Sequence, residues 1–381
     1  MFRCKALLMI AIGLYSGTAF PEQNIGDRQT SEVQNFRIES VADGFDSPWA
    51  MAFLPGGDLL VTDRSGSLNL IADGKRQSSP VGGVPEVRAS GQGGLLDLEL
   101  HPDFSAPGNG WIYLSYASPK QRGEKGRGAN TALMRARLRN NQLVDQELLF
   151  KAQPNYSQTQ HYGGRIVFDG EGNVYLTVGD RGGRDEVQQL DNARGKIFRL
   201  HDDGSIPEDN PFLGTKGATP STWSTGHRNP QGFAVHPETG VLWAHEHGPR
   251  GGDELNIIEG GKNYGWPIIT YGVNYSGSQI TPNTAMAGME QPVTYWVPSI
   301  APSGMAFLTG DTYAGWDGDL FIGSLKFQRV YRLVLDGQKV VHQESLLNGI
   351  GRVRAIEQGP DGFLYIAVEK PGRIVRLIPV E

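Results

Sequence analysis

Short apolar runs separated by polar turns recur along the whole chain. The run at residues 49–53 leads through Pro55-Gly56-Gly57-Asp58 into a second run at 59–62. The other copies pair residues 96–100 with 111–114, 165–168 with 174–177, 232–235 with 241–243, 304–307 with 319–322, and 354–357 with 363–366. A third run often follows, as at 195–200 and 372–377. Apolar, aromatic-rich runs of this length between turn residues predict β-strands.

The spacing of the copies predicts the architecture. The six copies follow one another at intervals of roughly 50 to 70 residues, and no helical run longer than about ten residues interrupts them. One small sheet cannot bury both faces, whereas sheets stacked around an axis bury a continuous core. We therefore predict an all-β fold, a six-bladed β-propeller at residues 41–381, preceded by an N-terminal extension at 20–40. Long connections should carry the functional residues to one end of the central channel.

The first residues are typical of an export signal. Arg3 and Lys5 precede a short apolar run at 6–15, and Gly17-Thr18-Ala19 offers a cleavage point after Ala19. We expect residues 1–19 to be a signal peptide and the mature protein to be periplasmic; a buried N-terminal strand is the alternative. The run is too short to span a bilayer comfortably, and no other segment approaches that length, so no membrane span is expected. The only cysteine, Cys4, would be removed with the signal.

Charge and motifs exclude several classes of ligand. The formal net charge of −6 is spread along the chain without long blocks. Nucleic acid is therefore not expected as a partner, because phosphate binding requires a basic face. No glycine-rich dinucleotide fingerprint stands between a strand and a helix, and no P-loop is present, so neither NAD nor ATP is expected.

Residues 246–256 contain acids, glycines and a proline without any strand or helix period. Ca²⁺ takes carboxylate and carbonyl oxygens, so Asp253, Glu254 and the carbonyls of Gly248 and Pro249 are candidate ligands. The alternative is a solvated loop. His245 and His247, two positions apart, would suit zinc if they lay on one face of a strand, but no third His or Cys stands nearby.

Further candidate chemistry lies in four glycine-rich or cationic segments. His161 stands in Gln160-His161-Tyr162-Gly163-Gly164-Arg165, and Asp180 follows at the end of a predicted strand, where a carboxylate can orient an imidazole. Arg228 and Asn229 stand in Gly226-His227-Arg228-Asn229-Pro230-Gln231-Gly232, where the arginine can stabilise charge on a carbonyl oxygen. Each also has a purely structural interpretation: a hydrogen-bonding histidine, or a buried salt bridge. The remaining segments are Ser90-Gly91-Gln92-Gly93-Gly94 and the pair formed by Lys326 and Arg352-Val353-Arg354, for which the residues alone favour a solvated edge strand.

Together these segments resemble the soluble quinoprotein sugar dehydrogenases, in particular the aldose sugar dehydrogenases. The resemblance covers residues from about 48 to about 377. It implies pyrroloquinoline quinone (PQQ) as the cofactor and His161 as the general base, with Asp180 beside it and Arg228 next to the reactive carbonyl. The implied cofactor contacts are Gln92, His161, Arg228, Asn229, Tyr275, Lys326, Arg352 and Arg354. It also implies one Ca²⁺ against PQQ, held by the carbonyls of Gly248 and Pro249, and a second near Glu254 and Tyr264, with Asp253 as a further candidate ligand.

The resemblance implies that the chain oxidises aldoses at the anomeric carbon to lactones. Electrons would pass to a periplasmic acceptor, and the protein would be a monomer or a homodimer. Two alternatives stay open: a calcium-dependent lactonase or other hydrolase on the same fold, and a propeller that binds sugar without catalysis. The glycines and basic residue of Gly248-Pro249-Arg250-Gly251-Gly252 replace acids of the classical soluble glucose dehydrogenase, which leaves the number of calcium ions open.

Overall fold

The computed structural model describes residues 25–381, and within them nearly all regular structure is β-strand. The exception is a single turn of 3₁₀ helix, η1 (Arg184–Glu186). None of the helices in this described range is long or apolar enough to cross a bilayer. The expected signal peptide at 1–19 lies outside the described residues.

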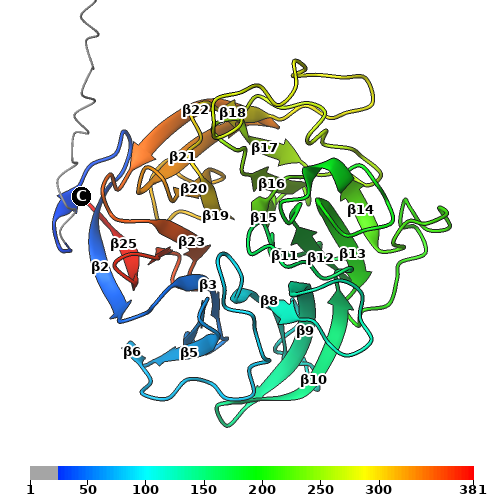
Figure 1. The fold of residues 1–381 in the computed structure, drawn as a ribbon. Helices are drawn as coiled ribbons and strands as arrows, with labels where there is room; N and C mark the ends of the chain where they lie inside the picture. Colours follow the sequence, from blue (N-terminus) through cyan, green and yellow to red (C-terminus); the bar gives the residue numbers. More distant parts are fainter. Residues whose placement is uncertain (1–24) are drawn as a thin grey trace, which may run out of the picture.

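Six sheets are arranged around a central axis, so the predicted six-bladed β-propeller is confirmed (Figure 1). Blade 1 contains β3 (Pro48–Phe53), β4 (Leu59–Asp63), β5 (Ser67–Ala72) and β6 (Lys75–Arg76). Blade 2 contains β7 (Leu95–Leu100), β8 (Trp111–Pro119), β9 (Ala129–Arg139) and β10 (Gln142–Lys151). Blade 3 contains β11 (Ile166–Phe168), β12 (Asn173–Val178), β13 (Lys196–His201) and β14 (Thr222–Thr225).

The remaining blades follow the same order, with one exception at the end. Blade 4 contains β15 (Pro230–Val235), β16 (Leu242–Glu246), β17 (Asp253–Ile257) and β18 (Thr294–Trp296). Blade 5 contains β19 (Pro302–Phe307), β20 (Leu320–Ser324), β21 (Arg329–Asp336) and β22 (Lys339–Leu346). Blade 6 contains β23 (Val353–Gln358), β24 (Leu364–Val368) and β25 (Arg373–Val380), and is completed by β2 (Asn35–Asp43) and β1 (Arg28–Gln29).

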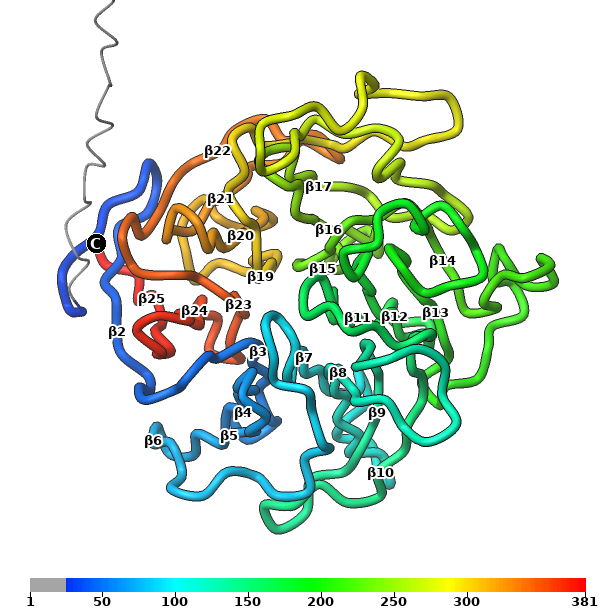
Figure 2. The backbone as a smooth tube through the Cα atoms, in the orientation of Figure 1, coloured from blue at the N-terminus to red at the C-terminus, as the bar shows by residue number. Residues whose placement is uncertain are grey.

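The chain closes the ring in blade 6. Strand β2 pairs antiparallel with β25, with Ile38 opposite Leu377, so segments from the two ends of the described chain share one sheet (Figure 2). The boundary that we expect at residue 41 falls inside β2. Phe36 and Ile38 are almost fully buried in the core beside Trp316. The segment before residue 41 is therefore part of the blade.

The paired runs of the sequence repeat are the first and second strands of the blades. First strands of neighbouring blades contact one another all around the axis. Apolar side chains fill the spaces between blades; Tyr113 and Leu133 of blade 2, for example, pack in one cluster with Leu176 and Phe198 of blade 3. Because all pairings within the blades are antiparallel, the start of each first strand and the end of each second strand lie at the same end of the propeller. The candidate residues collect at that end.

Candidate active site

Two cavities lie side by side at this end of the axis. The first, of about 270 Å³, is lined by Arg64, Gln92, Tyr162, Asn229, His247, Arg352, Arg354 and Glu369, among others. The second, of about 430 Å³, is lined by His161, Asp180, Arg184, Arg228, Pro249, Trp266 and Tyr275, among others. Consecutive residues face different cavities: His161 and Arg228 line the second, whereas Tyr162 and Asn229 line the first. The segments around positions 161 and 228 therefore form the shared wall.

His161 and Asp180 are brought together as the sequence suggests. The distance from His161 Nδ1 to Asp180 Oδ1 is 2.6 Å, and both side chains are largely buried. His161 has a positive φ of 54°, a conformation that few residues other than glycine adopt. Its backbone N–H donates to Gln92 Oε1 at 2.7 Å, so Gln92 helps to hold this conformation. The glycines after it permit a close approach, because a Cβ on Gly163 would lie 2.7 Å from the Thr177 carbonyl oxygen.

The electrostatic setting fixes the protonation states of the pair. Burial lowers the pKa of His161 more than the hydrogen bond with Asp180 raises it, and Arg228 lowers it further. Burial raises the pKa of Asp180, but the hydrogen bond and charge of His161, with the charge of Arg228, lower it overall. Asp180 is then an ionised acceptor at neutral pH, so His161 Nδ1 must carry the proton between them. His161 Nε2 is left with a lone pair, as a general base requires.

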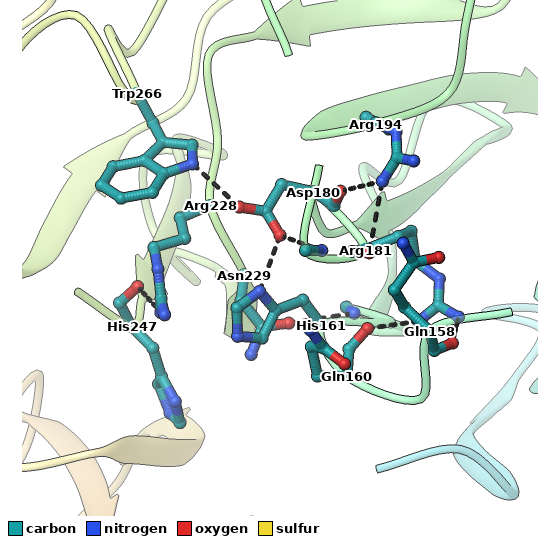
Figure 3. A network of polar contacts seen from close by, with 12 residues as sticks. Gln158, Gln160, His161, Asp180, Arg181, Arg194, Arg228, Asn229, His247 and Trp266 are labelled. Atoms are coloured by element: carbon teal, nitrogen blue, oxygen red, sulfur yellow. Dashed lines mark hydrogen bonds and ion pairs between the residues drawn. The ribbon is translucent and has the colours of Figure 1, made fainter. Parts of the chain in front are cut away.

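Trp266 links the acid and the cation of the second cavity (Figure 3). Its indole Nε1–H donates to Asp180 Oδ2 at 2.9 Å, while His161 contacts the other oxygen. The Arg228 guanidinium carbon lies 5.4 Å from the centre of the Trp266 ring, within cation–π range. The indole is 6% exposed. Trp266 therefore fixes the carboxylate of Asp180 and supports the Arg228 side chain at the same time.

A buried chain of hydrogen bonds holds the backbone at Arg228 and Asn229. Glu246 Oε2 accepts from both backbone N–H groups, at 3.3 Å for Asn229. Glu246 Oε1 lies 3.2 Å from His227 Nδ1, and His227 Nε2 lies 2.8 Å from Ser224 Oγ. The Arg228 side chain donates from Nη1 to the carbonyls of His247 and Gly248, at 2.8 and 3.2 Å. Arg228 is therefore held at its backbone and at its guanidinium.

The first cavity has a cationic wall with a carboxylate behind it. Arg352 Nε donates to Glu369 Oε2 at 2.8 Å, and Arg354 Nη2 lies 3.3 Å from Glu369 Oε1. Burial alone would raise the pKa of Glu369, but the two arginines lower it to about 2. Arg354 Nε and Tyr162 Oη are buried without a hydrogen-bond partner in the described structure. Unpaired donors beside net positive charge suit an anionic ligand.

The structure divides the expected cofactor contacts between the two cavities. Gln92, Asn229, Arg352 and Arg354 line the first, whereas His161, Arg228 and Tyr275 line the second. Tyr275 is 72% exposed and forms part of the outer wall. Lys326 is exposed and lines neither cavity, although its neighbour Leu325 lines the first. Its Nζ lies 5.1 Å from the centre of the Phe327 ring.

Asp253 has a structural role. Its Oδ1 accepts from Gly248 N at 2.8 Å, and its Oδ2 accepts from Ser299 Oγ, Ile300 N and Ala301 N at 2.7 to 2.9 Å. The side chain is fully buried, and four donors occupy its oxygens. This carboxylate therefore fixes the loop that carries the Gly248 carbonyl, and calcium ligation by Asp253 stays a prediction.

Glu254 fits a cation better. It pairs with Glu246 across the β16–β17 ladder, and both carboxylates line a cavity of about 10 Å³ together with Gly248, Tyr264 and Thr270. Burial, and then the charge of Glu246, raise the pKa of Glu254 well above its usual value. The cavity has room for about one small ion, and the carboxylates of Glu246 and Glu254 both line it. Such an oxygen-rich donor set matches Ca²⁺. Tyr264 lines the same cavity, and its hydroxyl donates to the Ile257 carbonyl at 2.6 Å.

No three His, Cys, Asp or Glu side chains come together as a metal-binding group within residues 25–381. His247 Nε2 bonds the Pro302 carbonyl at 2.5 Å, and His245 is fully buried. A calcium site that includes backbone carbonyls stays a prediction.

Sequence reasoning missed Glu369, Trp266 and Glu246 as parts of the site. A positional signal existed for the acids. Asp63 and Glu246 end the second strands of blades 1 and 4, and Asp180 and Glu369 follow those of blades 3 and 6. Acids at this repeated position all bind backbone N–H groups or side chains of the site end.

The comparisons with known proteins place the chain in a family. Residues 45–376 match the family model described as glucose/sorbosone dehydrogenase. The aldose sugar dehydrogenase YliI of Escherichia coli (strain K12) is 44% identical over 349 residues, which cover 90% of this chain and 92% of that protein. The crystal structure of the soluble aldose sugar dehydrogenase from Escherichia coli in its apo form has a TM-score of 0.86 and 42% identity, and covers 91% of this chain and 100% of that one. The PQQ-bound aldose sugar dehydrogenase of Streptomyces coelicolor has a TM-score of 0.72 and 29% identity, and covers 91% and 98%.

The fold and the site thus define a β-propeller oxidoreductase. The chain belongs to the glucose/sorbosone dehydrogenase family, which confirms the resemblance drawn from the sequence and the prediction that the protein is an enzyme.

Proposed function

We propose that the chain oxidises aldoses at the anomeric carbon to lactones, with PQQ as the cofactor. PQQ, when bound, supplies the group that accepts the hydride. The main observation behind the proposal is the hydrogen-bonded pair of His161 and Asp180. This pair leaves His161 Nε2 available as a base, and it lies at the wall shared with the cationic first cavity. Hydride transfer from a hydroxyl carbon requires a base for the hydroxyl proton, and this pair provides one.

The chain's own residues support a division of roles between the cavities. Arg352 and Arg354, with Gln92 and Asn229, would hold the carboxylates and carbonyls of PQQ, because Arg354 and Tyr162 line this cavity and their Nε and Oη atoms have no other hydrogen-bond partner in the described structure. His161 Nε2 would take the hydroxyl proton, and Arg228 would stabilise negative charge on the cofactor's oxygen. The carbonyls of Gly248 and Pro249 are proposed ligands of a Ca²⁺ beside the cofactor, and Glu254 with Tyr264 of a second.

A direct assay tests this function. The purified protein, freed of cofactor and metal, is mixed with PQQ, Ca²⁺, glucose and a redox dye, and dye bleaching is followed. We expect bleaching only when protein, PQQ and sugar are all present. Lactone hydrolysis without PQQ would favour a calcium-dependent hydrolase, and glucose binding without any turnover would favour a sugar-binding propeller; either result would overturn the proposal.

Two further expectations belong with this proposal. The protein would act in the periplasm, because residues 1–19 have the pattern that is typical of an export signal. It would deliver the electrons of the aldose to an acceptor in that compartment, as a monomer or a homodimer.

A further inference from the structure

The hairpins at the two ends of the propeller differ in charge. Those that join first and second strands lie at the end opposite the cavities, at residues 54–58, 101–110, 169–172, 236–241, 308–319 and 359–363. They contain nine acidic side chains and no lysine or arginine: Asp58, Asp103, Asp169, Glu171, Glu238, Asp311, Asp317, Asp319 and Asp361. The β13–β14 connection at the same end adds four acids against one lysine.

The connections at the cavity end have the opposite sign. They join second and third strands, at residues 64–66, 120–128, 179–195, 247–252, 325–328 and 369–372. Eight of their basic side chains are exposed, against three exposed acids, Asp185, Glu186 and Asp191. The eight are Lys120, Arg122, Lys125, Arg127, Arg184, Arg250, Lys326 and Lys370. A chain with a net charge of −6 thus presents a basic face around its cofactor cavities.

Half of these cations lie in one connection, residues 120–128, which we call the basic loop. The loop borders the segment that leads to the general base, because Arg127 N donates to Asn155 O and Asn155 N donates to Lys125 O. Its four cationic side chains line neither cavity. In the described structure none of the four forms a salt bridge, and only Lys120 forms a side-chain hydrogen bond, to the adjacent Gln121 carbonyl. Their charges are therefore not used to hold the fold or the cofactor.

We propose that this basic face, of which the basic loop carries half of the exposed cations named above, docks a small redox protein whose surface is acidic around its redox centre. The inference rests on the proposed function, since it names the partner of the same site. Oxidation of one aldose releases two electrons and two protons: the electrons must leave through an acceptor, one at a time for a one-electron carrier, and the protons pass to solvent. A carrier has to approach the cavity end, where the cofactor would lie.

The basic cavity end and the acidic opposite end together favour a carrier with an acidic surface. Complementary surface charge raises association rates by about 10- to 10³-fold at low ionic strength, and salt removes this gain. The acidic opposite end repels the same partner, so an acidic carrier is oriented toward the cavities before contact. A basic carrier would be drawn to the wrong end.

The decisive variant reverses the basic loop: Lys120→Glu, Arg122→Glu, Lys125→Glu and Arg127→Glu together. A matched control makes the same charge change at exposed positions away from the cavity end, with Lys75→Glu, Arg139→Glu, Lys216→Glu and Lys339→Glu. The assay follows reduction of an acidic plastocyanin by the PQQ- and Ca²⁺-loaded enzyme with glucose, between low and high NaCl, with a neutral dye in parallel.

We expect the loop variant to reduce plastocyanin at least 10-fold more slowly at low salt, with a flattened salt dependence and unchanged dye turnover. The control should stay within about twofold of the wild type. Titration of the cofactor-free protein with plastocyanin should show the same loss of binding, so the docking surface is tested without catalysis. Absent dye turnover with intact plastocyanin binding would refute the proposed function and leave the docking surface standing.

Three results would overturn the docking proposal. The loop variant could keep the wild-type rate, salt dependence and binding; the control could lose as much as the loop variant; or basic cytochrome c could bind the wild type better than plastocyanin does. Binding of the wild type to phosphatidylglycerol vesicles but not to plastocyanin, with that binding lost in the loop variant, would assign the face to a membrane surface instead.

Discussion

Replacing Trp266 with Phe tests whether the indole positions the catalytic pair. The substitution keeps an aromatic ring but removes the N–H that donates to Asp180 Oδ2 at 2.9 Å. A hydrogen bond to a charged group contributes about 1.5–3 kcal/mol. Asp180 is buried, so water does not readily replace the lost donor. If that loss appears mainly in the transition state, where His161 takes the proton, kcat falls about 10- to 100-fold.

The matched control is Trp296→Phe. The Trp296 Nε1–H donates to Gln343 Oε1 at 2.8 Å, and the side chain is 8% exposed, but the acceptor is neutral and lies on β22. Both substitutions should lower the Tm. Only Trp266→Phe should lower kcat, with a smaller change in KM, because the substrate's binding contacts remain.

The pH dependence adds a second readout. Without the indole donor the Asp180 carboxylate keeps more negative charge toward His161 and raises the pKa of that imidazole, so the acid limb of the kcat profile should move to higher pH. Stopped-flow dye reduction in the fully loaded enzyme measures both quantities. An unchanged kcat and acid limb in Trp266→Phe, with a drop in Tm like that of the control, would show that the indole only supports the fold.

The remaining predictions concern the base, the cradle and the metal. His161→Ala should keep PQQ bound and reduce kcat by about 10²- to 10⁴-fold, and wild-type turnover would remove His161 from the mechanism. In the wild type, activity should be lost on acidification with a midpoint below pH 6.5, since burial lowers the pKa of His161; a midpoint above 7 would contradict this. Arg352→Gln should weaken PQQ binding about 10-fold or more with little effect on turnover at saturating PQQ, measured by titration of the cofactor-free protein. Chelated protein should be inactive with PQQ alone, and Ca²⁺ should restore activity and raise the Tm by mass action; full activity without metal, or restoration by Zn²⁺ alone, would refute the calcium assignment.

The fold was predictable because its signal is local and repeated. In each blade an apolar run, a Gly/Pro/Asp turn and another apolar run predict the first two strands. Six copies of this pattern favour a six-bladed propeller over other all-β folds. The closing strand β2 was harder to find. Its partner is β25, more than 300 residues away, and no local pattern within residues 35–43 indicates that they pair with the edge of that sheet. The extension predicted at 20–40 therefore contains part of a blade.

The site was predictable where one motif carries both the residue and its role. His161 and Asp180 come together because one precedes the first strand and the other follows the second strand of the same blade. Roles that depend on contacts between blades were not accessible. Trp266 reaches Asp180 from a loop 86 positions away, and Asp253 is saturated by donors at 299–301.

Contacts between distant segments also explain why two neighbouring acids, Asp253 and Glu254, have different roles. Asp253 and Glu254 are neighbours in β17, and strand alternation sends their side chains to different faces. Asp253 meets four donors from the polypeptide, so its charge is already satisfied by the fold. Glu254 lies opposite Glu246, a second carboxylate, and within residues 25–381 it accepts a side-chain hydrogen bond only from Asn256 Nδ2, at 3.4 Å. Two adjacent carboxylates of this kind, one buried and one half-buried, are stabilised by sharing a proton or holding a cation, and this, more than the acidity of the segment, is what favours a metal at Glu254.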